Sequence, residues 1–321
     1  MRSIVARSAL AVILAGLVPA GASAGTIGFD VVHQGTAHEA FFCMSAEKDA
    51  MIAVGAPNLL FDSTDAGKSW SLNTAVKADG ALFGCRLKHG VGLVVGQMGL
   101  ILRQEGGVWS EVPKVTDARL FAVDMNARGL AVAVGAFGTI LVSTDAGKNW
   151  SRVDYDWSTT NTEGFEPHIY GVTVAEDGAV TISGEFAAIL RSTDAGNTWS
   201  VVNTGTASLF DVVIDGDGIG FAVGQDGLVL RTADSGLTWS KVASGVTSNL
   251  LGIERDGAGH VLVTGMRSLL IGTDDGSALK AILPGDVATG WYQGIVDSGK
   301  GTWLLAGQAG RLVRVIDNET K

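Results

Sequence analysis

The octapeptide Ser143-Thr-Asp-Ala-Gly-Lys-Asn-Trp150 decides the fold, because the chain repeats this pattern at regular intervals. Near-complete copies end at Trp70, Trp199 and Trp239, and an apolar segment that ends in glycine precedes each of them. Seven glycines mark the repeat: Gly55, Gly96, Gly135, Gly184, Gly224, Gly265 and Gly307. They are separated by 41, 39, 49, 40, 41 and 42 residues, and periods of this length are typical of four-stranded propeller blades or other solenoid units.

Each repeat divides into four short strands, which are clearest between residues 120 and 153. We expect strands at 120–124, 130–134, 139–142 and 149–153, joined by turns rich in glycine, aspartate and asparagine. Outside the N-terminus, no stretch of ten or more residues has a helical apolar period. The sequence therefore predicts an all-β, seven-bladed β-propeller with four-stranded antiparallel blades.

The last repeat lacks an outer strand, because the chain ends soon after the segment Arg311–Arg314. At the other terminus, Phe29–Thr36 overlays the outer-strand segment Trp199–Thr206. We expect this N-terminal strand to complete the seventh blade. Closure would remove the exposed strand edges that promote aggregation, and we expect a monomer.

The repeated octapeptide has a mechanical explanation that needs no ligand. Asp145 can accept hydrogen bonds from the amides of its own turn, Gly147 can adopt a left-handed conformation, and Trp150 can wedge between blades. We assign the same structural roles to Asp65, Gly67, Trp70, Asp194, Gly196, Trp199, Asp234, Gly236 and Trp239. The sixth repeat keeps Asp274 and lacks the tryptophan.

The N-terminus has the layout of a secretory signal peptide. Arg2 and Arg7 precede an apolar run at 9–18 and the small-residue site Ala22-Ser-Ala24. The run is shorter than the roughly 20 residues that a membrane span needs. We predict a signal peptide at 1–24, one propeller domain at 25–321, no membrane span after cleavage, and a periplasmic or otherwise secreted protein.

The charge of the chain argues against nucleic-acid and lipid partners. Removal of residues 1–24 takes away two arginines and no acidic residue, so the formal charge changes from -10 to -12. Such a surface repels nucleic acid and anionic membranes. The five histidines have no metal-ligand spacing, and we expect neither a metal nor another cofactor.

The Ser-Thr-Asp-x-Gly-x-x-Trp turn resembles the Asp-box or BNR repeat. The longer pattern Val-Gly-x-x-Gly-x-Ile-Leu-Arg-Ser-Thr-Asp is similar to the photosystem II stability/assembly factor-like propellers, and the resemblance covers essentially the whole mature chain. It implies an exported, seven-bladed assembly factor for a membrane-associated complex, without catalysis. The motif is specific for the fold, while propellers carry many functions.

This resemblance also draws attention to a basic position just before the octapeptide. Four repeats have arginine there: Arg103, Arg191, Arg231 and Arg314. The other three have Asp62, Val142 and Gly272, which interrupts any continuous basic surface. Two interpretations remain open, a basic contact surface and arginines that pair locally within the sheets.

The 49-residue spacing adds about eight residues between Asp154 and His168, on the rim where the Gly-x-x-Gly turns are expected. Apolar side chains on loops of a rigid scaffold are typical of protein-binding surfaces. We therefore predict partner contacts for Tyr155, Trp157, Phe165, Phe137, Phe186, Met98 and Met266. The competing interpretation is that Trp157 and Phe165 fold over the end of the barrel as a plug.

Cys43 and Cys85 lie on the expected innermost strands of consecutive blades. An exported chain meets an oxidising compartment, where the two side chains can form a disulfide across one blade interface. The alternative is a pair of small buried thiols.

Sialidases also contain Asp-boxes, which makes a glycosidase the enzymatic alternative. Such enzymes need an arginine cluster, a tyrosine paired with a glutamate, and an acid/base aspartate. Tyr170 and Tyr292 occupy a repeat position filled by phenylalanine or leucine elsewhere, which predicts core packing. We assign no catalytic residue and expect a protein-binding scaffold, with carbohydrate or small-ligand binding in the channel as a further alternative.

Overall fold

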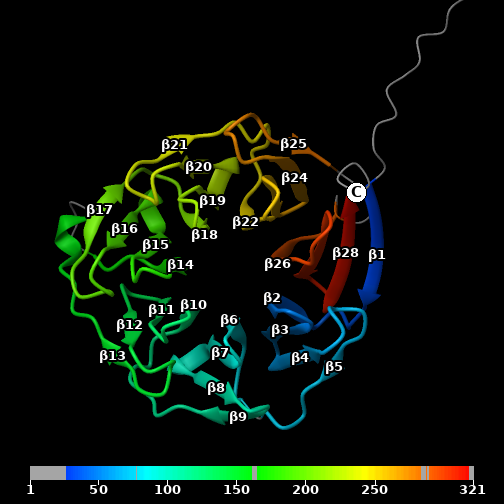
Figure 1. Ribbon diagram of the computed structural model, residues 1–321, viewed down its shortest axis with the longest axis horizontal. Helices are drawn as coiled ribbons and strands as arrows, with labels where there is room; N and C mark the ends of the chain where they lie inside the picture. The colour runs from blue at the N-terminus through cyan, green and yellow to red at the C-terminus, as the bar shows by residue number, and fades with distance from the viewer. Residues whose placement is uncertain (1–26, 77, 161–164, 283–286, 288, 318–321) are drawn as a thin grey trace, which may run out of the picture.

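Seven four-stranded sheets form a closed ring around a central axis in the computed structural model (Figure 1). The structure describes residues 27–76, 78–160, 165–282, 287 and 289–317. The seven-bladed, all-β fold predicted from the repeat is confirmed. The predicted signal peptide at 1–24 lies outside the described residues.

In each blade the strands run in order from the central channel to the rim (Figure 1). The innermost strands are β2 (Ala40–Glu47), β6 (Leu82–Lys88), β10 (Leu120–Met125), β14 (Ile169–Val174), β18 (Leu209–Ile214), β22 (Leu250–Arg255) and β26 (Tyr292–Asp297). The second strands are β3 (Ala50–Ala56), β7 (Val91–Gly96), β11 (Ala131–Gly135), β15 (Val180–Gly184), β19 (Gly220–Gly224), β23 (His260–Gly265) and β27 (Thr302–Gly307).

The other two strands of each blade lie toward the rim. The third strands are β4 (Leu59–Ser63), β8 (Ile101–Glu105), β12 (Ile140–Ser143), β16 (Ile189–Ser192), β20 (Val229–Thr232), β24 (Ser268–Thr273) and β28 (Arg311–Asp317). The outer strands are β5 (Ser71–Leu72), β9 (Val108–Glu111), β13 (Ser151–Arg152), β17 (Ser200–Asn203), β21 (Ser240–Lys241), β25 (Lys280–Ala281) and β1 (Ile27–His33). Short 3-10 turns are η1 (Gln97–Gly99), η2 (Trp157–Thr159), η3 (Glu185–Ala187) and η4 (Gln225–Gly227).

The N-terminal strand closes the ring, as the sequence predicts. β1 pairs antiparallel with β28, with Ile27 opposite Asp317 and Val31 opposite Val313. Figure 1 shows the two termini of the propeller side by side in blue and red. The seventh sheet therefore combines the first strand with the last three.

The seven repeat glycines are required by a close backbone approach. At Gly55 a Cβ atom would lie 1.8 Å from the carbonyl oxygen of Ala40, and at Gly135 it would lie 2.0 Å from that of Arg119. The corresponding distances at the other five repeat glycines are between 1.9 and 2.5 Å. A side chain at these positions would collide with the backbone at the start of the innermost strand or just before it, so each blade needs glycine there.

The octapeptide forms a self-contained turn, which we call the aspartate turn. Asp145 Oδ1 accepts hydrogen bonds from Ser143 Oγ (2.8 Å) and from the backbone N–H of Asn149 (2.9 Å). Trp150 Nε1 donates to the carbonyl of Gly147 (3.0 Å), and Gly147 has φ +78°. The Trp150 ring is buried in an apolar cluster that includes Leu93 and residues of the adjacent blade. Each turn therefore fastens two blades together.

Equivalent indole bonds form at Trp70, Trp199 and Trp239, with distances of 3.2, 3.0 and 3.2 Å. The sixth repeat departs from the prediction, because Asp275 rather than Asp274 closes the turn. Thr273 Oγ1 donates to Asp275 Oδ1 (2.8 Å), as does the backbone N–H of Ser277 (2.8 Å). Asp275 lies ten residues after the repeat glycine Gly265, as Asp145 does after Gly135, and only the glycine that follows it comes one residue earlier.

These turns predict a loss of stability in acid. Hydrogen bonds from hydroxyl, amide and backbone groups lower the pKa of Asp145, Asp194, Asp234 and Asp275 to about 2. A carboxylate with a lowered folded-state pKa stabilises the fold above its unfolded pKa of about 3.9, and this contribution is lost as the pH falls toward 2. We expect the urea midpoint to fall steeply between pH 4 and 2, as these four carboxylates become protonated. An unchanged midpoint at pH 2 would contradict this account.

Candidate functional site

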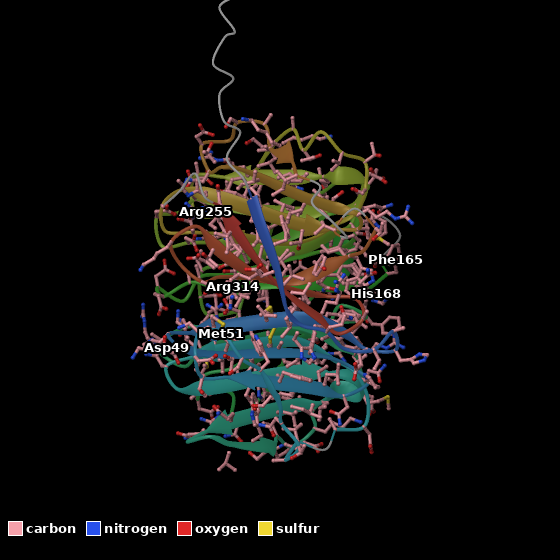
Figure 2. All side chains as sticks on the ribbon, turned by 90° about the vertical axis from the view of Figure 1, so that its right-hand side faces the viewer. Asp49, Met51, Phe165, His168, Arg255 and Arg314 are labelled. Atoms are coloured by element: carbon pink, nitrogen blue, oxygen red, sulfur yellow. A yellow bond between two sulfur atoms is a disulfide. The ribbon has the colours of Figure 1, made fainter. Side chains whose placement is uncertain are left out.

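The propeller has two chemically different faces. The turns between second and third strands form one of them, together with residues 155–160 and 165–168, and we call it the turn face. The aspartate turns lie on the opposite face, since strands alternate in direction within each blade. In the side view, Phe165 and His168 lie on one side of the disc, and Asp49 and Arg255 lie toward the other (Figure 2).

The turn face displays large apolar side chains on a strained backbone. Phe137 is 62% exposed and Met98 is 61% exposed, and both residues have φ near +54° at the tip of their turns (53° and 55°). Phe186 has the same conformation with φ 61°. The left-handed conformation costs a non-glycine residue about 1–2 kcal/mol. Apolar side chains therefore occupy positions where glycine or asparagine would be more stable.

Two more of the predicted contact residues are exposed on this face. Met266 is 46% exposed and Phe165 is 40% exposed. The Phe165 ring contacts the Phe186 ring with a centroid separation of 5.2 Å. Phe165 thereby contacts the turn of the fourth blade.

The prediction that Trp157 contacts a partner is wrong, because Trp157 is only 5% exposed. Its indole packs over Gly138, where a Cβ would lie 2.1 Å from Trp157 Nε1, and it joins the core between the third and fourth blades. Tyr155 packs edge-on against Trp157 with a centroid separation of 4.8 Å. The first half of the connection therefore seals a blade interface, and Phe165 in the second half is exposed.

His168, which the sequence analysis did not select, links the outer turns to the channel. Its Nδ1 accepts a hydrogen bond from the backbone N–H of Phe137 (3.1 Å), and its ring lies 5.0 Å from the Phe137 ring. On its other side it contacts Phe121 (6.0 Å) and Tyr170 (6.1 Å). Phe137 and the channel rings therefore form one continuous aromatic surface through His168.

Five consecutive blades place an aromatic ring at the mouth of the central channel. We call this set the aromatic collar: Phe42, Phe83, Phe121, Tyr170 and Phe210. Successive ring centroids are separated by 5.5, 5.9, 5.3 and 5.5 Å. Each residue sits at a register shift in its innermost strand, and such bulges redirect a side chain out of the regular alternation. The collar rings are half-buried, so the core position predicted for Tyr170 is wrong.

The two remaining blades have Leu251 and Gln293 at the bulge, and Tyr292 is not in the collar. Tyr292 lies one position earlier, pairs with Gly307 and is 1% exposed. The repeat position assigned to Tyr292 is therefore wrong by one residue, although its burial in the core is as expected. Trp291 adds a further ring by stacking on Phe42 with a centroid separation of 5.8 Å.

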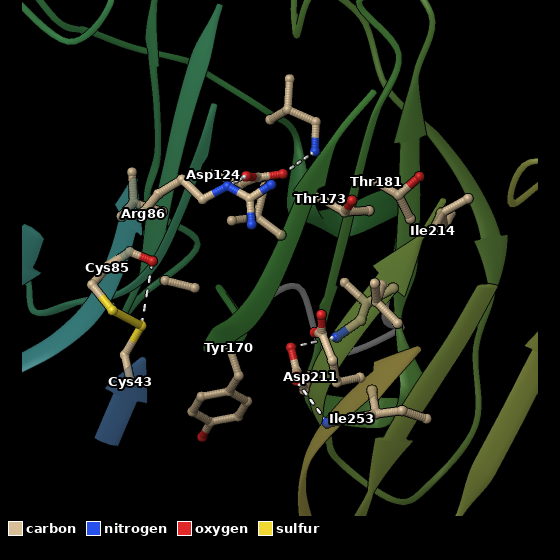
Figure 3. Close-up of a pocket in the computed structure, with 18 of the residues that line it drawn as sticks. Cys43, Cys85, Arg86, Asp124, Tyr170, Thr173, Thr181, Asp211, Ile214 and Ile253 are labelled. Atoms are coloured by element: carbon tan, nitrogen blue, oxygen red, sulfur yellow. Dashed lines mark hydrogen bonds and ion pairs between the residues drawn. A yellow bond between two sulfur atoms is a disulfide. The ribbon is translucent and has the colours of Figure 1, made fainter. Parts of the chain in front are cut away.

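Below the collar, the innermost strands surround a cavity of about 610 Å³. A belt of charged groups lies three residues further along these strands, and Figure 3 shows Arg86 reaching Asp124 there. Arg86 Nε lies 2.8 Å from Asp124 Oδ1. Burial raises the pKa of Asp211 to about 6 and that of Glu254 to about 8. The channel thus combines an apolar mouth with a polar interior.

Cys43 and Cys85 form a disulfide in the channel wall between the first and second blades (Figure 3), with a Cα–Cα distance of 5.8 Å. Asp211 occupies the position of Cys43 in the fifth blade and also reaches the next blade, where its Oδ2 accepts a hydrogen bond from the backbone N–H of Ile253 (3.0 Å).

The disulfide between Cys43 and Cys85 predicts that the intact mass of the unreduced protein is lower than that of the reduced protein by two hydrogen atoms. Equal masses before and after reduction would exclude the bridge.

The four predicted basic positions do not form a patch, because each arginine bonds to the aspartate turn of the next blade. Nε of Arg103, Arg191 and Arg231 donates to the carbonyls of Ala146 (2.7 Å), Ser235 (2.8 Å) and Asp274 (2.7 Å). Arg314 closes the series by donating to Gly67 O of the first blade (3.1 Å). Arg103 also pairs with Glu105 (2.7 Å). These arginines therefore form neither a basic surface nor ion pairs alone. All four donate hydrogen bonds to backbone carbonyls of the next blade, and we call them the arginine ties.

Comparison with known proteins gives similarity of fold. No protein-family model matches the chain, and no curated protein matches its sequence. YCF48 from Cyanidioschyzon merolae matches with 18% identity and a TM-score of 0.70 over 90% of this chain and 98% of that one. YCF48 bound to D1 peptide matches with 18% identity and a TM-score of 0.69 over 90% and 96%. A streptogramin B lyase has 13% identity and a TM-score of 0.77 over 91% and 98%.

These similarities support the propeller fold and include both a peptide-bound protein and an enzyme. Among the residues that the structure describes, no helix has the length and hydrophobicity needed to span a bilayer. In the same part of the chain, no three His, Cys, Asp or Glu side chains are arranged to hold a metal ion.

Proposed function

We propose that this chain is an exported, non-catalytic propeller that binds a protein partner through its turn face. The observation that carries the proposal is the apolar surface formed by Phe137, Phe165, Phe186 and the aromatic collar, part of it held on left-handed backbone. An energetically unfavourable conformation that keeps a large apolar side chain in solvent indicates selection for contact rather than for stability.

The finer assignment is an assembly or stability factor for a membrane-associated complex, in the periplasm or another exported compartment. It is supported by the repeats that resemble Asp-boxes and by the signal-peptide layout of the N-terminus, and by the fold similarity to YCF48, one structure of which is bound to D1 peptide. The chain has a rigid ring as scaffold and apolar loops as contact points, which suits recognition of an exposed segment of another protein.

The site geometry gives little support to a glycosidase. Burial raises the pKa of both Tyr170 and Tyr292 to about 12, which disfavours a tyrosinate nucleophile, although Glu185 lies beside Tyr170. Of the arginines that line the cavity, Arg86 pairs with Asp124 and Arg191 bonds to the carbonyl of Ser235. A substrate carboxylate would need a cluster of unengaged arginines.

Site-specific photocrosslinking tests the binding face. A photoreactive phenylalanine analogue at position 137 is expected to crosslink one discrete partner in the membrane fraction of the source cells, since Phe137 is exposed on the turn face. The matched control is position 237, where Leu237 is 56% exposed on an aspartate turn of the opposite face. Equal products from both positions, or none from position 137, would argue against the proposal.

Substitution of the turn residue separates binding from folding. In Phe137→Asn we expect the free energy of unfolding to stay unchanged or to rise by up to about 1 kcal/mol, because asparagine tolerates the left-handed conformation. Crosslinking to the partner from position 165 should fall at least about tenfold, the loss expected for a buried aromatic contact at an interface. A variant that is strongly destabilised, or that crosslinks like wild type, would show that Phe137 serves the fold.

A further inference from the structure

The central channel is lined by aromatic side chains at its mouth and by charged side chains deeper inside. The aromatic collar lies at the mouth on the turn face, and Arg86, Asp124 and Glu254 lie three residues further along their strands. With the rise of a β-strand, this places the charged belt about 10 Å below the collar. A cavity of about 610 Å³ is large enough for a small organic molecule.

The cations that line this cavity already have partners. Arg86 Nε lies 2.8 Å from Asp124 Oδ1, and Lys88 Nζ lies 2.9 Å from Glu176 Oε1. Arg191 is bonded to the aspartate turn of the next blade through Nε. Arg86, whose positive charge also acts on Glu254, is therefore held by Asp124 and makes no ion pair with Glu254 within the described chain.

The carboxylates that line the cavity differ in their hydrogen-bond and ion-pair partners. Asp211 accepts hydrogen bonds from the backbone N–H groups of Val212 (2.9 Å) and Ile253 (3.0 Å), and Asp215 pairs with Arg255 (2.6 Å). Glu254, on β22, lines the same cavity and forms no hydrogen bond or ion pair with any residue that the structure describes. Glu254 is thus the one acidic group of the charged belt that lacks a partner within the described chain.

We propose that the channel binds a linear organic cation, with its alkyl stem against the aromatic collar and its ammonium group beside Glu254. An alkyl stem suits the collar because ring surfaces are apolar, and the ammonium group suits a desolvated carboxylate that lacks a counter-ion. The formal charge of -10 also favours entry of cations over anions. This inference does not depend on the turn-face partner, since a free amine suffices to test it.

The protonation of Glu254 gives the proposal a second, independent readout. Burial raises its pKa to about 8, with Asp215, Asp211 and Asp297 acting in the same direction and Arg86 in the opposite one. The carboxyl is therefore mostly protonated in the empty channel at pH 7. An ammonium ligand pairs with the ionised form, so binding releases a proton.

The direct test is calorimetric titration of the folded protein with n-hexylammonium at pH 8. Its stem matches the depth between collar and belt, so we expect saturable binding, weaker binding of methylammonium, and no binding of hexanoate, which has a similar stem and the opposite charge. Glu254→Gln should weaken hexylammonium binding at least tenfold. The matched control is Glu111→Gln, which removes the same charge from the exposed strand β9 and should bind like wild type.

Folding of the variant is not at risk, because glutamine resembles the protonated glutamic acid that occupies the empty channel, and an unchanged melting temperature at pH 6 would verify this. In wild type the association constant should rise by up to about tenfold per pH unit below pH 8 and level off above it. In Glu254→Gln this pH dependence should disappear.

A last titration distinguishes the two sources of such a cation. A peptide with one lysine that competes with hexylammonium, while its norleucine counterpart does not, would assign the site to a side chain of a partner protein. Binding of free amines without peptide competition would assign it to a small metabolite. Equal binding of hexanoate and hexylammonium, full affinity in Glu254→Gln, or absence of binding to any amine would overturn the proposal.

Discussion

A chain that begins at Ala37 is expected to lose its monomeric ring. Removal of β1 leaves β28 as an exposed edge, with the apolar residues Leu312 and Val313 next to unpaired backbone groups. It also removes Ile27 and Phe29 from the apolar cluster of the seventh blade. Loss of two half-buried side chains and of six paired residues should lower the free energy of unfolding by about 5 kcal/mol, and the melting temperature by at least about 10 °C.

The measurement is thermal unfolding combined with size-exclusion chromatography, and the control is the chain that begins at Gly25. An unpaired edge strand is a template for intermolecular pairing, so oligomers should accompany the lower melting temperature. Should the shorter chain remain monomeric with the melting temperature of the longer one, closure by β1 would not be what stabilises the ring.

Replacement of Arg255 by methionine is expected to cost about 3 kcal/mol of unfolding free energy. The Arg255 side chain is 3% exposed, and it contacts Asp215 (2.6 Å), Asp217 (3.1 Å) and Asp274. It thereby ties the inner hairpin of the fifth blade to the aspartate turn of the sixth. Removal of the cation from a buried cluster typically costs 3–5 kcal/mol. The lower end applies, because Asp215 and Asp217 are about half exposed.

Arg152→Met is the matched control for this substitution, since Arg152 is exposed on the outer strand β13. Hydrogen bonds from Arg255 lower the pKa of Asp217, so its stabilisation is present above the unfolded pKa of about 3.9 and is lost in acid. The difference in unfolding free energy between wild type and Arg255→Met, measured by chemical denaturation, should therefore become smaller as the pH falls from 5 to 3. A difference in unfolding free energy below about 1 kcal/mol at pH 7 would show that Arg255 does little to offset the repulsion among these aspartates.

The candidate binding face was only partly predictable from sequence. Phe137, Met98 and Met266 are exposed where the turn spacing places them, because a four-residue turn leaves little room to bury a large side chain. Trp157 was wrongly assigned to the same surface. Its burial depends on the absence of a side chain at Gly138, a contact between residues from different turns that periodicity cannot reveal.

The aromatic collar and the arginine ties were not predicted from sequence, because both depend on how strands and blades meet in the tertiary structure. Phenylalanine on an innermost strand predicts core packing by simple alternation, and only the register shift turns it into the channel. An arginine before the aspartate turn looks like a surface residue until the next blade places a carbonyl within reach, as Ala146 does for Arg103. In both cases the deciding partner belongs to another repeat.

The amino-acid sequence alone determined the number of blades, their four-stranded pattern and the closure of the ring by the N-terminal strand, because each of these follows from a local pattern repeated at a fixed period. The tertiary structure alone decided which side chains face solvent, which line the channel and which carboxylate there forms no ion pair with the described residues. The physical reason is that burial and charge pairing depend on groups some forty residues away in the next blade, and repeat spacing carries no information on how those groups meet.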